Sequence, residues 1–242
     1  MKMMLSPEDL LIVSFPRSGS TWVRFMLANL IVGSDRPLGF ETMEEHVPDL
    51  HTPGIEDILR KMPPGRLLKS HSLYDQQYKR VVYLVRDGRD TMVSYYHYHC
   101  PHNLQATFID FLRIHHVIWP GAWHRHVESW LDHKDGLSLL LVRYEDLLTD
   151  PDDQLRRIAD FAALPADQER IAQAVRNCEF ATLQKIETEK GGFRTDNPGF
   201  RFFRTGRSGT WKEYFGPEHK ELFKRLANPT LLRLGYVDGP NW

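Results

Sequence analysis

The chain has 242 residues, with 31 Lys and Arg against 32 Asp and Glu. This length suffices for one domain with a buried core, and the near-zero net charge excludes a general field that would attract nucleic acid or an anionic membrane. Any anion must therefore be bound by local groups. Only two cysteines, Cys100 and Cys178, are present, which predicts a reducing compartment rather than a disulfide framework.

The N-terminus and the hydropathy pattern predict neither export nor membrane insertion. The opening "MKMMLSPEDLLIVSF" places acidic residues before a short apolar run and lacks the apolar core and cleavage site of a signal peptide. No stretch approaches the roughly 18 consecutive apolar residues of a membrane span. We expect a cytoplasmic protein formed as a single domain over residues 1–242, because no linker, repeat or low-complexity stretch divides the chain.

Short apolar runs alternate with helical patterns along the first part of the chain. Continuous apolar runs, typical of buried parallel strands, lie at Leu10–Ser14, Arg66–Lys69, Val81–Val85 and Leu137–Val142. Apolar residues at intervals of three and four predict helices at Thr21–Ile31, Thr91–Tyr98, Phe108–Val117 and Trp123–Leu131. This alternation predicts an α/β fold in which helices flank a central parallel sheet through right-handed crossovers.

The pattern changes in the last part of the chain. Helices are predicted at Pro151–Phe161 and Ala166–Val175, and an amphipathic helix at Pro217–Leu226. The intervening stretch "GGFRTDNPGFRFFRTGRSGTW" is either a functional flap or a disordered segment. Ligands of α/β folds bind beyond the carboxyl ends of the strands, so the residues after each strand are the candidates for a site.

The loop after the first strand, "SFPRSGST", predicts an anion site. It leads into a helix at about Thr21, so backbone N–H groups and the positive end of the helix dipole face one point. Arg17 adds a charged fork of donors, and Ser18, Ser20 and Thr21 add hydroxyls. The spacing resembles that of a G-x-x-x-x-G-K-[ST] phosphate loop, with Ser20 at the Lys position. A simple helix cap is the alternative, but it explains only one hydroxyl.

Two later strand ends carry further polar groups. In "VRDGRDTMVSYYHY", Arg86 leaves a strand, Asp87-Gly88 turns the chain, and Ser94 falls two turns into the next helix, so Arg86 and Ser94 can converge on a second phosphate. A surface ion pair of Arg86 is the alternative. In "GRLLKSHSLY", His71 follows a strand with Lys69 two residues before it. An imidazole with a pKa of about 6.5 is a natural base for a hydroxyl proton, although a lone histidine is more often a surface or core residue.

A metal site is a weaker interpretation of the histidine-rich segment "HYHCPH". It holds His97, His99, Cys100 and His102. His97 and His99 would lie about 200° apart on a helix and cannot share a metal ion while the helix persists. No Cys-x-x-Cys or His-Glu-x-x-His pattern supports the cluster. We therefore expect no metal.

Taken together, these sites resemble the PAPS-dependent sulfotransferases, close to the cytosolic branch; PAPS is 3′-phosphoadenosine 5′-phosphosulfate. Residues 16–22 match the family's phosphosulfate loop, Pro-Lys-Ser-Gly-Thr-Thr-Trp, position by position, and Arg86 and Ser94 match its 3′-phosphate pair. Lys69 and His71 match the family's Lys-Thr-His, in which the histidine is the base. A basic loop that closes over the nucleotide is matched by residues 204–212. The resemblance spans roughly residues 9–215.

The resemblance implies a single-domain sulfotransferase fold like that of phosphate-loop NTPases. It implies transfer of a sulfuryl group from PAPS to a hydroxyl or amine of a small-molecule acceptor, with PAP as product and no metal. His71 would be the general base, with Arg17 and Lys69 as the other catalytic residues. The implied donor-binding residues are Arg17, Ser18, Gly19, Ser20, Thr21, Trp22, Arg86, Ser94, Tyr144, Cys178, Phe180, Arg204, Thr205 and Gly206. Among these, Trp22, Tyr144 and Phe180 would contact the adenine.

Three features depart from the family pattern. Arg17 replaces the family's catalytic Lys; it keeps the charge but is a poor proton donor. Thr205 replaces a Lys of the C-terminal loop and removes one charge. The family's dimerisation motif, Lys-x-x-x-Thr-Val-x-x-x-Glu, is not found, so the oligomeric state stays open.

Two other functions compete with this interpretation. A phosphate-loop kinase or NTPase would need a Lys where Ser20 stands and a carboxylate for Mg²⁺ after a strand. A non-catalytic PAP-binding protein would bind nucleotide without transfer. The acceptor is not determined by the sequence, because the segments expected to shape its pocket suit phenols, alcohols and sugars alike; they are Pro37–Pro64, Tyr74–Tyr78, Pro101–Thr107 and Lys190–Phe203.

Overall fold

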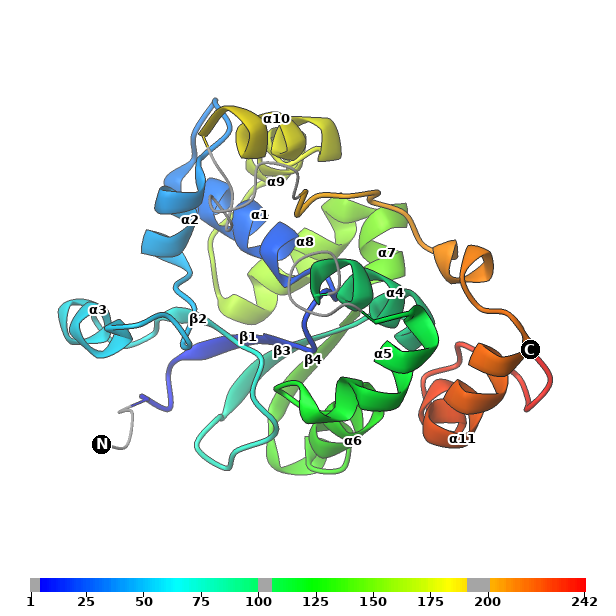
Figure 1. Ribbon diagram of the computed structural model, residues 1–242. Helices are drawn as coiled ribbons and strands as arrows, with labels where there is room; N and C mark the ends of the chain where they lie inside the picture. Colours follow the sequence, from blue (N-terminus) through cyan, green and yellow to red (C-terminus); the bar gives the residue numbers. More distant parts are fainter. Residues whose placement is uncertain (1–4, 100–105, 191–200) are drawn as a thin grey trace.

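The central feature of the fold is a parallel sheet. The computed structural model describes residues 5–99, 106–190 and 201–242, and the strands among them are β1 (Leu10–Ser14), β2 (Leu67–Ser70), β3 (Arg80–Val85) and β4 (Ser138–Arg143). They pair in the order β2-β1-β3-β4, each neighbour parallel to the next (Figure 1). The predicted α/β class is confirmed, and each predicted strand end lies within one residue of the observed one.

Helices cover both faces of this sheet because alternate strand residues are apolar on both sides. On one face, Leu10, Ile12, Val82 and Leu84 pack in one buried cluster. Leu11, Val13, Val81 and Tyr83 belong to the cluster on the other face. The helices that contribute to the first cluster are α1 (Ser20–Val32), α2 (Phe40–His46), α7 (Tyr144–Thr149), α8 (Pro151–Ala162), α9 (Gln168–Asn177) and α10 (Phe180–Lys190).

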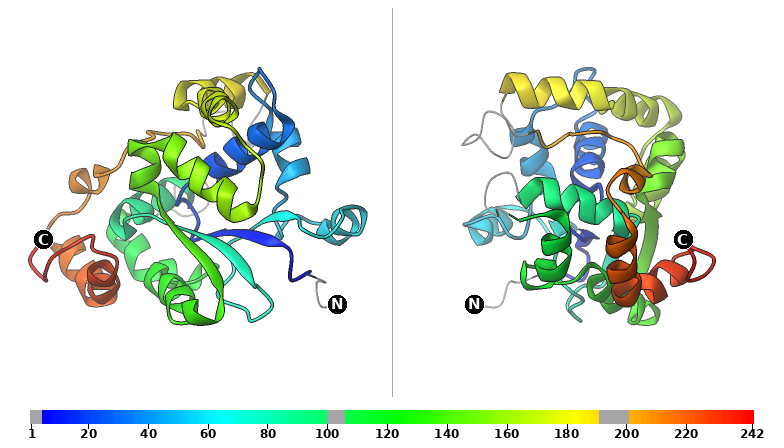
Figure 2. Two further views of the ribbon diagram at one scale, coloured as in Figure 1. Left: turned by 180° about the vertical axis from the view of Figure 1, so that it is seen from behind. Right: turned by 45° about the vertical axis from the view of Figure 1, so that its right-hand side comes forward.

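The opposite layer is formed by α3 (Ile55–Lys61), α4 (Gly88–His99), α5 (Phe108–Ile114), α6 (Trp123–Leu131) and α11 (Pro217–Arg233). Short 3-10 helices lie at η1 (His115–Val117), η2 (Lys134–Gly136) and η3 (Thr210–Glu213). Figure 2 shows the described stretch from residue 201 to α11 passing from one layer to the other. The two ends of this stretch pack in different clusters: Phe203 lies in the first and Trp211 in the second.

The predicted helices are present, but some bounds differ. The stretch expected as one helix at Phe108–Val117 is divided into α5 and η1, and α11 continues to Arg233 through Pro229. Helices α2, α3, α7 and α10 were not predicted. None of the helices in the described part of the chain combines the length and apolarity that crossing a bilayer requires.

The register of the strands places the candidate residues at one edge. Val13 pairs with Ser70, Ser14 with Leu84, and Val85 with Arg143. The segments after all four strands therefore leave the sheet side by side. This is the edge at which a doubly wound sheet binds its ligands.

Candidate active site

The loop between β1 and α1 has an unusual backbone. Arg17 has a φ of 69° and Gly19 a φ of 100°, so both lie in the left-handed region. A Cβ at Gly19 would lie 2.7 Å from Cδ2 of Tyr144, so only glycine fits there. Gly19 is the N-cap of α1 and no side chain caps the helix. The first N–H groups of α1 are therefore left for an anion or water.

A pocket of about 710 Å³ opens beside this loop. The structure brings almost every predicted site residue onto its walls, although they come from six separate parts of the chain. The predicted residues that line it are Arg17, Gly19, Ser20, Thr21, Trp22, Lys69, His71, Arg86, Ser94, Tyr144, Phe180, Arg204, Thr205 and Gly206. Ser18 and Cys178 are the two predicted residues outside this lining.

Two arginines, Arg17 and Arg86, line the pocket. Arg17 donates from Nε to Oγ of Ser94 at 3.1 Å and from Nη2 to the carbonyl of Phe202 at 2.8 Å. Arg86 donates to the carbonyls of Arg17 and Arg207 at 3.2 Å and 2.9 Å. Within the described residues, the buried atoms Arg17 Nη1 and Arg86 Nε have no hydrogen-bond partner. An anion in the pocket would satisfy both.

The charge of Arg17 persists despite its surroundings. Burial and the neighbouring Arg86 lower the pKa of Arg17 to about 10, so it stays protonated at neutral pH. Its guanidinium also lies 4.1 Å from the ring centre of Phe202 and 5.3 Å from that of Tyr98, and aromatic faces stabilise cations. Arg17 is therefore a fixed positive charge on the pocket wall.

Aromatic rings pack against these two arginines at the pocket wall. The ring centres of Trp22 and Tyr144 lie 6.2 Å apart in an edge-to-face arrangement, and Arg86 stacks on Tyr144 at 4.4 Å. A Cβ at Gly206 would lie 2.5 Å from Cδ2 of Phe180, so the 204–206 segment approaches that ring closely because it carries no side chain there. These rings form walls suited to a flat heterocycle.

The Cys178 side chain lies in the core rather than in the pocket. Its carbonyl accepts a hydrogen bond from Nε1 of Trp22 at 3.0 Å, whereas its thiol receives one from Nδ2 of Asn29 at 3.4 Å. Burial raises the pKa of this thiol. Cys178 thus affects the site only indirectly, because its backbone carbonyl holds the indole of Trp22, which lines the pocket. Ser18 is also buried, and its hydroxyl has no partner among the described residues.

His71 lines the same pocket as a neutral imidazole. Its Nδ1–H donates to the carbonyl of Ser14 at 2.6 Å, which leaves Nε2 as the basic nitrogen. Burial and the charge of Lys69 hold the pKa of His71 well below its usual value. The His71 carbonyl accepts a bond from Nε2 of His126 at 3.1 Å, and Tyr83 donates to Nδ1 of His126 at 2.9 Å. This buried chain fixes the backbone of His71.

Lys69 forms an ion pair that sequence reasoning missed. Its ammonium lies 2.6 Å from Oδ2 of Asp49, and both residues line the pocket. Burial lowers the pKa of Lys69 to about 8, against the opposing effect of Asp49. His51, two residues on, receives a bond from the backbone N–H of His71 at 3.3 Å and contacts Trp119, with ring centres 4.5 Å apart. The only prior signal for Asp49 and His51 was their place in the segment Pro37–Pro64.

The metal hypothesis falls partly outside the described residues, since Cys100 and His102 belong to the segment 100–105. Across residues 5–99, 106–190 and 201–242 no group of three or more His, Cys, Asp or Glu side chains could hold a metal ion. Much of the predicted acceptor segments Pro101–Thr107 and Lys190–Phe203 likewise lies outside the described residues.

Residues 7–235 match the model of the sulfotransferase domain family. The chain is 30% identical over 244 residues to sulfotransferase 1A1 of Bos taurus, covering 90% of this chain and 81% of that protein. It is 28% identical over 256 residues to sulfotransferase 1B1 of Canis lupus familiaris, covering 93% and 86%. The crystal structure of mouse sulfotransferase SULT7A1 complexed with PAP gives a TM-score of 0.70 at 25% identity, covering 93% and 85%. Retinol dehydratase in complex with androsterone and PAP has a similar fold, with a TM-score of 0.74 at 22% identity and coverage of 95% and 82%.

Proposed function

Since the chain belongs to the sulfotransferase family, we propose that it transfers a sulfuryl group from PAPS to a hydroxyl or amine of a small-molecule acceptor. The observation that carries this proposal is that one pocket is lined both by guanidinium groups with unpartnered donors, those of Arg17 and Arg86, and by the neutral imidazole of His71.

The residues present fit a nucleotide that carries two phosphate groups. The uncapped N-terminus of α1 and the loop before it suit the 5′-phosphate, as do Ser20 and Thr21 at the start of the helix. Arg86 and Ser94 suit the 3′-phosphate, and the rings of Trp22 and Tyr144 offer an apolar wall against which adenine can pack. The related mouse sulfotransferase SULT7A1 was crystallised with PAP, which supports the same ligand here.

The donor supplies an activated sulfuryl group, and the protein supplies position, charge and a base. The acceptor oxygen forms a bond to sulfur while the bond from sulfur to the 5′-phosphate oxygen breaks. Nε2 of His71 accepts the acceptor's proton, a contribution of roughly 10²- to 10⁴-fold in rate. Its Nδ1–H bond to the Ser14 carbonyl fixes the tautomer that this step requires. PAP and the sulfated acceptor are the products.

Lys69 and Arg17 contribute charge. Both line the pocket, Lys69 two residues from the base and Arg17 in the loop that would hold the 5′-phosphate. Negative charge spreads over the sulfuryl oxygens and the departing phosphate during transfer, and preorganised cations are worth most where that charge develops. Because the described residues hold these side chains by defined bonds, little reorganisation is needed.

Two substitutions test the proposal. His71→Ala should reduce transfer of labelled sulfate from PAPS at least about 100-fold, while calorimetry shows PAP binding within about twofold of the wild type. The assay uses acceptors found by screening phenols, alcohols, sugars and amines with labelled PAPS. His116→Ala, at an exposed histidine outside the pocket, is the matched control. Near-normal turnover by His71→Ala would remove that residue from its role.

The second substitution addresses the donor. Arg86→Ala should weaken PAPS binding about 10- to 100-fold, because a charge-assisted contact to the 3′-phosphate is lost, and should change binding of adenosine 5′-phosphosulfate far less. Arg125→Ala, at an exposed arginine, is the control. Equal losses for the two nucleotides would contradict the 3′-phosphate assignment. Tighter binding of ATP with Mg²⁺ than of PAP by the wild type would favour a phosphate-loop kinase instead.

A further inference from the structure

The first turn of α4 and the residue before it carry three buried charged side chains to which the transfer reaction gives no role. Asp87, Arg89 and Asp90 are 6%, 5% and 1% exposed. A buried charge is costly unless it is paired and hydrogen-bonded. The partners of these residues therefore indicate what the turn stabilises.

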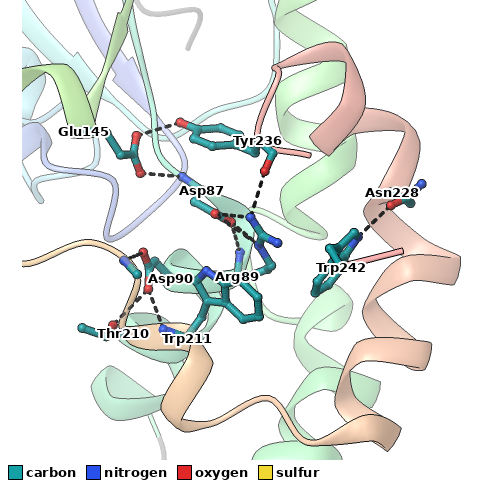
Figure 3. Close-up of polar contacts among 10 residues, drawn as sticks. Asp87, Arg89, Asp90, Glu145, Thr210, Trp211, Asn228, Tyr236 and Trp242 are labelled. Atoms are coloured by element: carbon teal, nitrogen blue, oxygen red, sulfur yellow. Dashed lines mark hydrogen bonds and ion pairs between the residues drawn. The ribbon is translucent and has the colours of Figure 1, made fainter. Parts of the chain in front are cut away.

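Asp90 is bonded to three consecutive residues that lie about 120 positions later in the chain. One carboxylate oxygen accepts bonds from the Thr210 hydroxyl at 3.0 Å and the Trp211 N–H at 2.8 Å, and the other accepts the Gly209 N–H at 2.6 Å (Figure 3). Gly209 is the N-cap of η3 and has no side chain with which to cap it. Asp90 thus caps η3 from another element, satisfying N–H groups that would otherwise lack partners.

Arg89 contacts the same segment. Its guanidinium lies 4.0 Å from the ring centre of Trp211 and 4.5 Å from that of Trp242, and the two indoles also contact each other edge to face. Asp87 pairs with it at 2.6 Å, and the carbonyl of Tyr236 accepts a bond from it at 3.1 Å. Figure 3 shows Arg89 beside Trp211 and bonded to Asp87 and Tyr236.

A further carboxylate ties this cluster to the helix that follows β4. Glu145 accepts the N–H of Asp87 at 3.0 Å and the hydroxyl of Tyr236 at 2.8 Å. The turn is therefore fixed to the sheet edge, to α7 and to the chain after α11 at once. Any segment bonded to this turn is therefore fixed relative to the sheet edge, to α7 and to the chain after α11.

The segment fastened in this way leads directly from the pocket. Arg204, Thr205 and Gly206 line it, and the carbonyl of the next residue, Arg207, accepts a bond from Arg86 at 2.9 Å. Asp90 lies one helical turn before Ser94, another pocket residue, on the same helix. One rigid turn thus connects the predicted 3′-phosphate contacts with the segment 204–211.

We propose that Asp90 and Arg89 are positioning residues that hold residues 204–206 at the proposed nucleotide site in the pocket, with Trp242 completing the attachment of Trp211. This inference rests on the proposed donor site. It assigns these residues no contact with the reacting atoms; they act on donor binding through the segment 204–211. Their loss should therefore weaken the nucleotide site and spare the chemical step.

Limited trypsin digestion without nucleotide tests the attachment independently of the donor. Arg204 and Arg207 are the cleavage sites in the segment, and mass spectrometry reports their rates. Asp90→Asn should accelerate cleavage there at least about fivefold. Asp110→Asn is the matched control, because Asp110 is also a helix-capping carboxylate but bonds at its own helix terminus and not to residues 209–211. Unchanged cleavage in Asp90→Asn would overturn the proposal, whether or not PAP is the ligand.

Calorimetry and steady-state rates test the functional part. Asp90→Asn should raise the Kd for PAP and the KM for PAPS about 10-fold, with kcat at saturating PAPS within about threefold. Asp90→Glu, which keeps the charge, should recover part of the loss. Trp242→Ala should weaken PAP in the same direction by about threefold and serves as the test should Asp90→Asn not fold. Faster cleavage with unchanged PAP affinity, or a fall in kcat equal to the rise in KM, would overturn the positioning role; failure of the wild type to bind PAP would instead refute the proposed function.

Discussion

Asp49→Asn tests whether Lys69 depends on its ion pair for the charge proposed to act on the sulfuryl group. With the carboxylate 2.6 Å away, burial still lowers the pKa of Lys69 to about 8. At pH 7 the ammonium is thus about one pKa unit, or ~1.4 kcal/mol, from releasing its proton. Removing the carboxylate removes the attraction that opposes burial, so the pKa of Lys69 should fall further and the amine should be largely neutral near pH 7.

The size of the effect follows from the two ways in which the variant can respond. Keeping an unpaired buried ammonium would cost about 3–5 kcal/mol, whereas releasing the proton costs only ~1.4 kcal/mol at pH 7. The second response is cheaper. The free energy of unfolding should therefore fall by only about 1–2 kcal/mol, while kcat should fall about 100-fold because a neutral amine stabilises the sulfuryl oxygens poorly.

The assay is the pH dependence of kcat, with Asp57→Asn, at an exposed ion pair, as the control. In the wild type the Lys69 charge, and with it the rate, should be lost as the pH rises through about 8. In Asp49→Asn the same decline should occur at lower pH. The double variant Asp49→Asn, Lys69→Gln should be no slower than Lys69→Gln alone. An unmoved pH profile, or losses that multiply in the double variant, would refute the reasoning.

Three further predictions concern the base, the loop and the core. His71 acts when deprotonated and its pKa lies well below its usual value, so kcat/KM should not decline until the pH falls clearly below about 6.5; a decline centred at or above that pH would contradict this. Gly19→Ala should lower thermal stability and weaken PAP at least about 10-fold by forcing a Cβ against Tyr144, as scanning calorimetry and titration would show. Cys178→Ala should destabilise the fold by about 1 kcal/mol yet leave PAP affinity within twofold, because only the carbonyl of residue 178 reaches Trp22. A large loss of affinity would place the thiol in the site.

The sheet could be predicted from the sequence because each strand contains a continuous apolar run, which in β1 and β3 is buried on both faces. Helices α2 and α3 could not. Each has seven residues, with only Met43 buried in α2 and only Ile55 and Leu59 in α3, so neither presents a repeated apolar face. Their packing comes from tertiary contacts rather than from a local pattern.

Most of the predicted site residues lie on the pocket because they follow strand ends, and parallel strands bring those ends together. Phe180 and residues 204–206 follow no strand and were placed by the family resemblance. The partners of these residues could not be predicted in the same way. Asp49 pairs with Lys69 across 20 positions and Asp90 bonds Thr210 across 120, and no spacing rule relates such pairs. The position of Cys178 two residues before Phe180 suggested a place near the site, but it did not show that the backbone carbonyl rather than the thiol makes the contact with Trp22.

Arg17 fits the proposed reaction even though it cannot act as a proton donor. Its pKa of about 10 keeps the guanidinium charged at neutral pH, and two of its nitrogens are bonded to Ser94 and to the Phe202 carbonyl. The group that leaves sulfur is a phosphate, and a phosphate monoester has a second pKa of about 6. Such an oxygen needs no proton at pH 7; it needs a nearby positive charge. The buried, unpartnered Nη1 of Arg17 can supply that charge, so the substitution of Arg for the family's Lys removes proton donation from a step that does not require it.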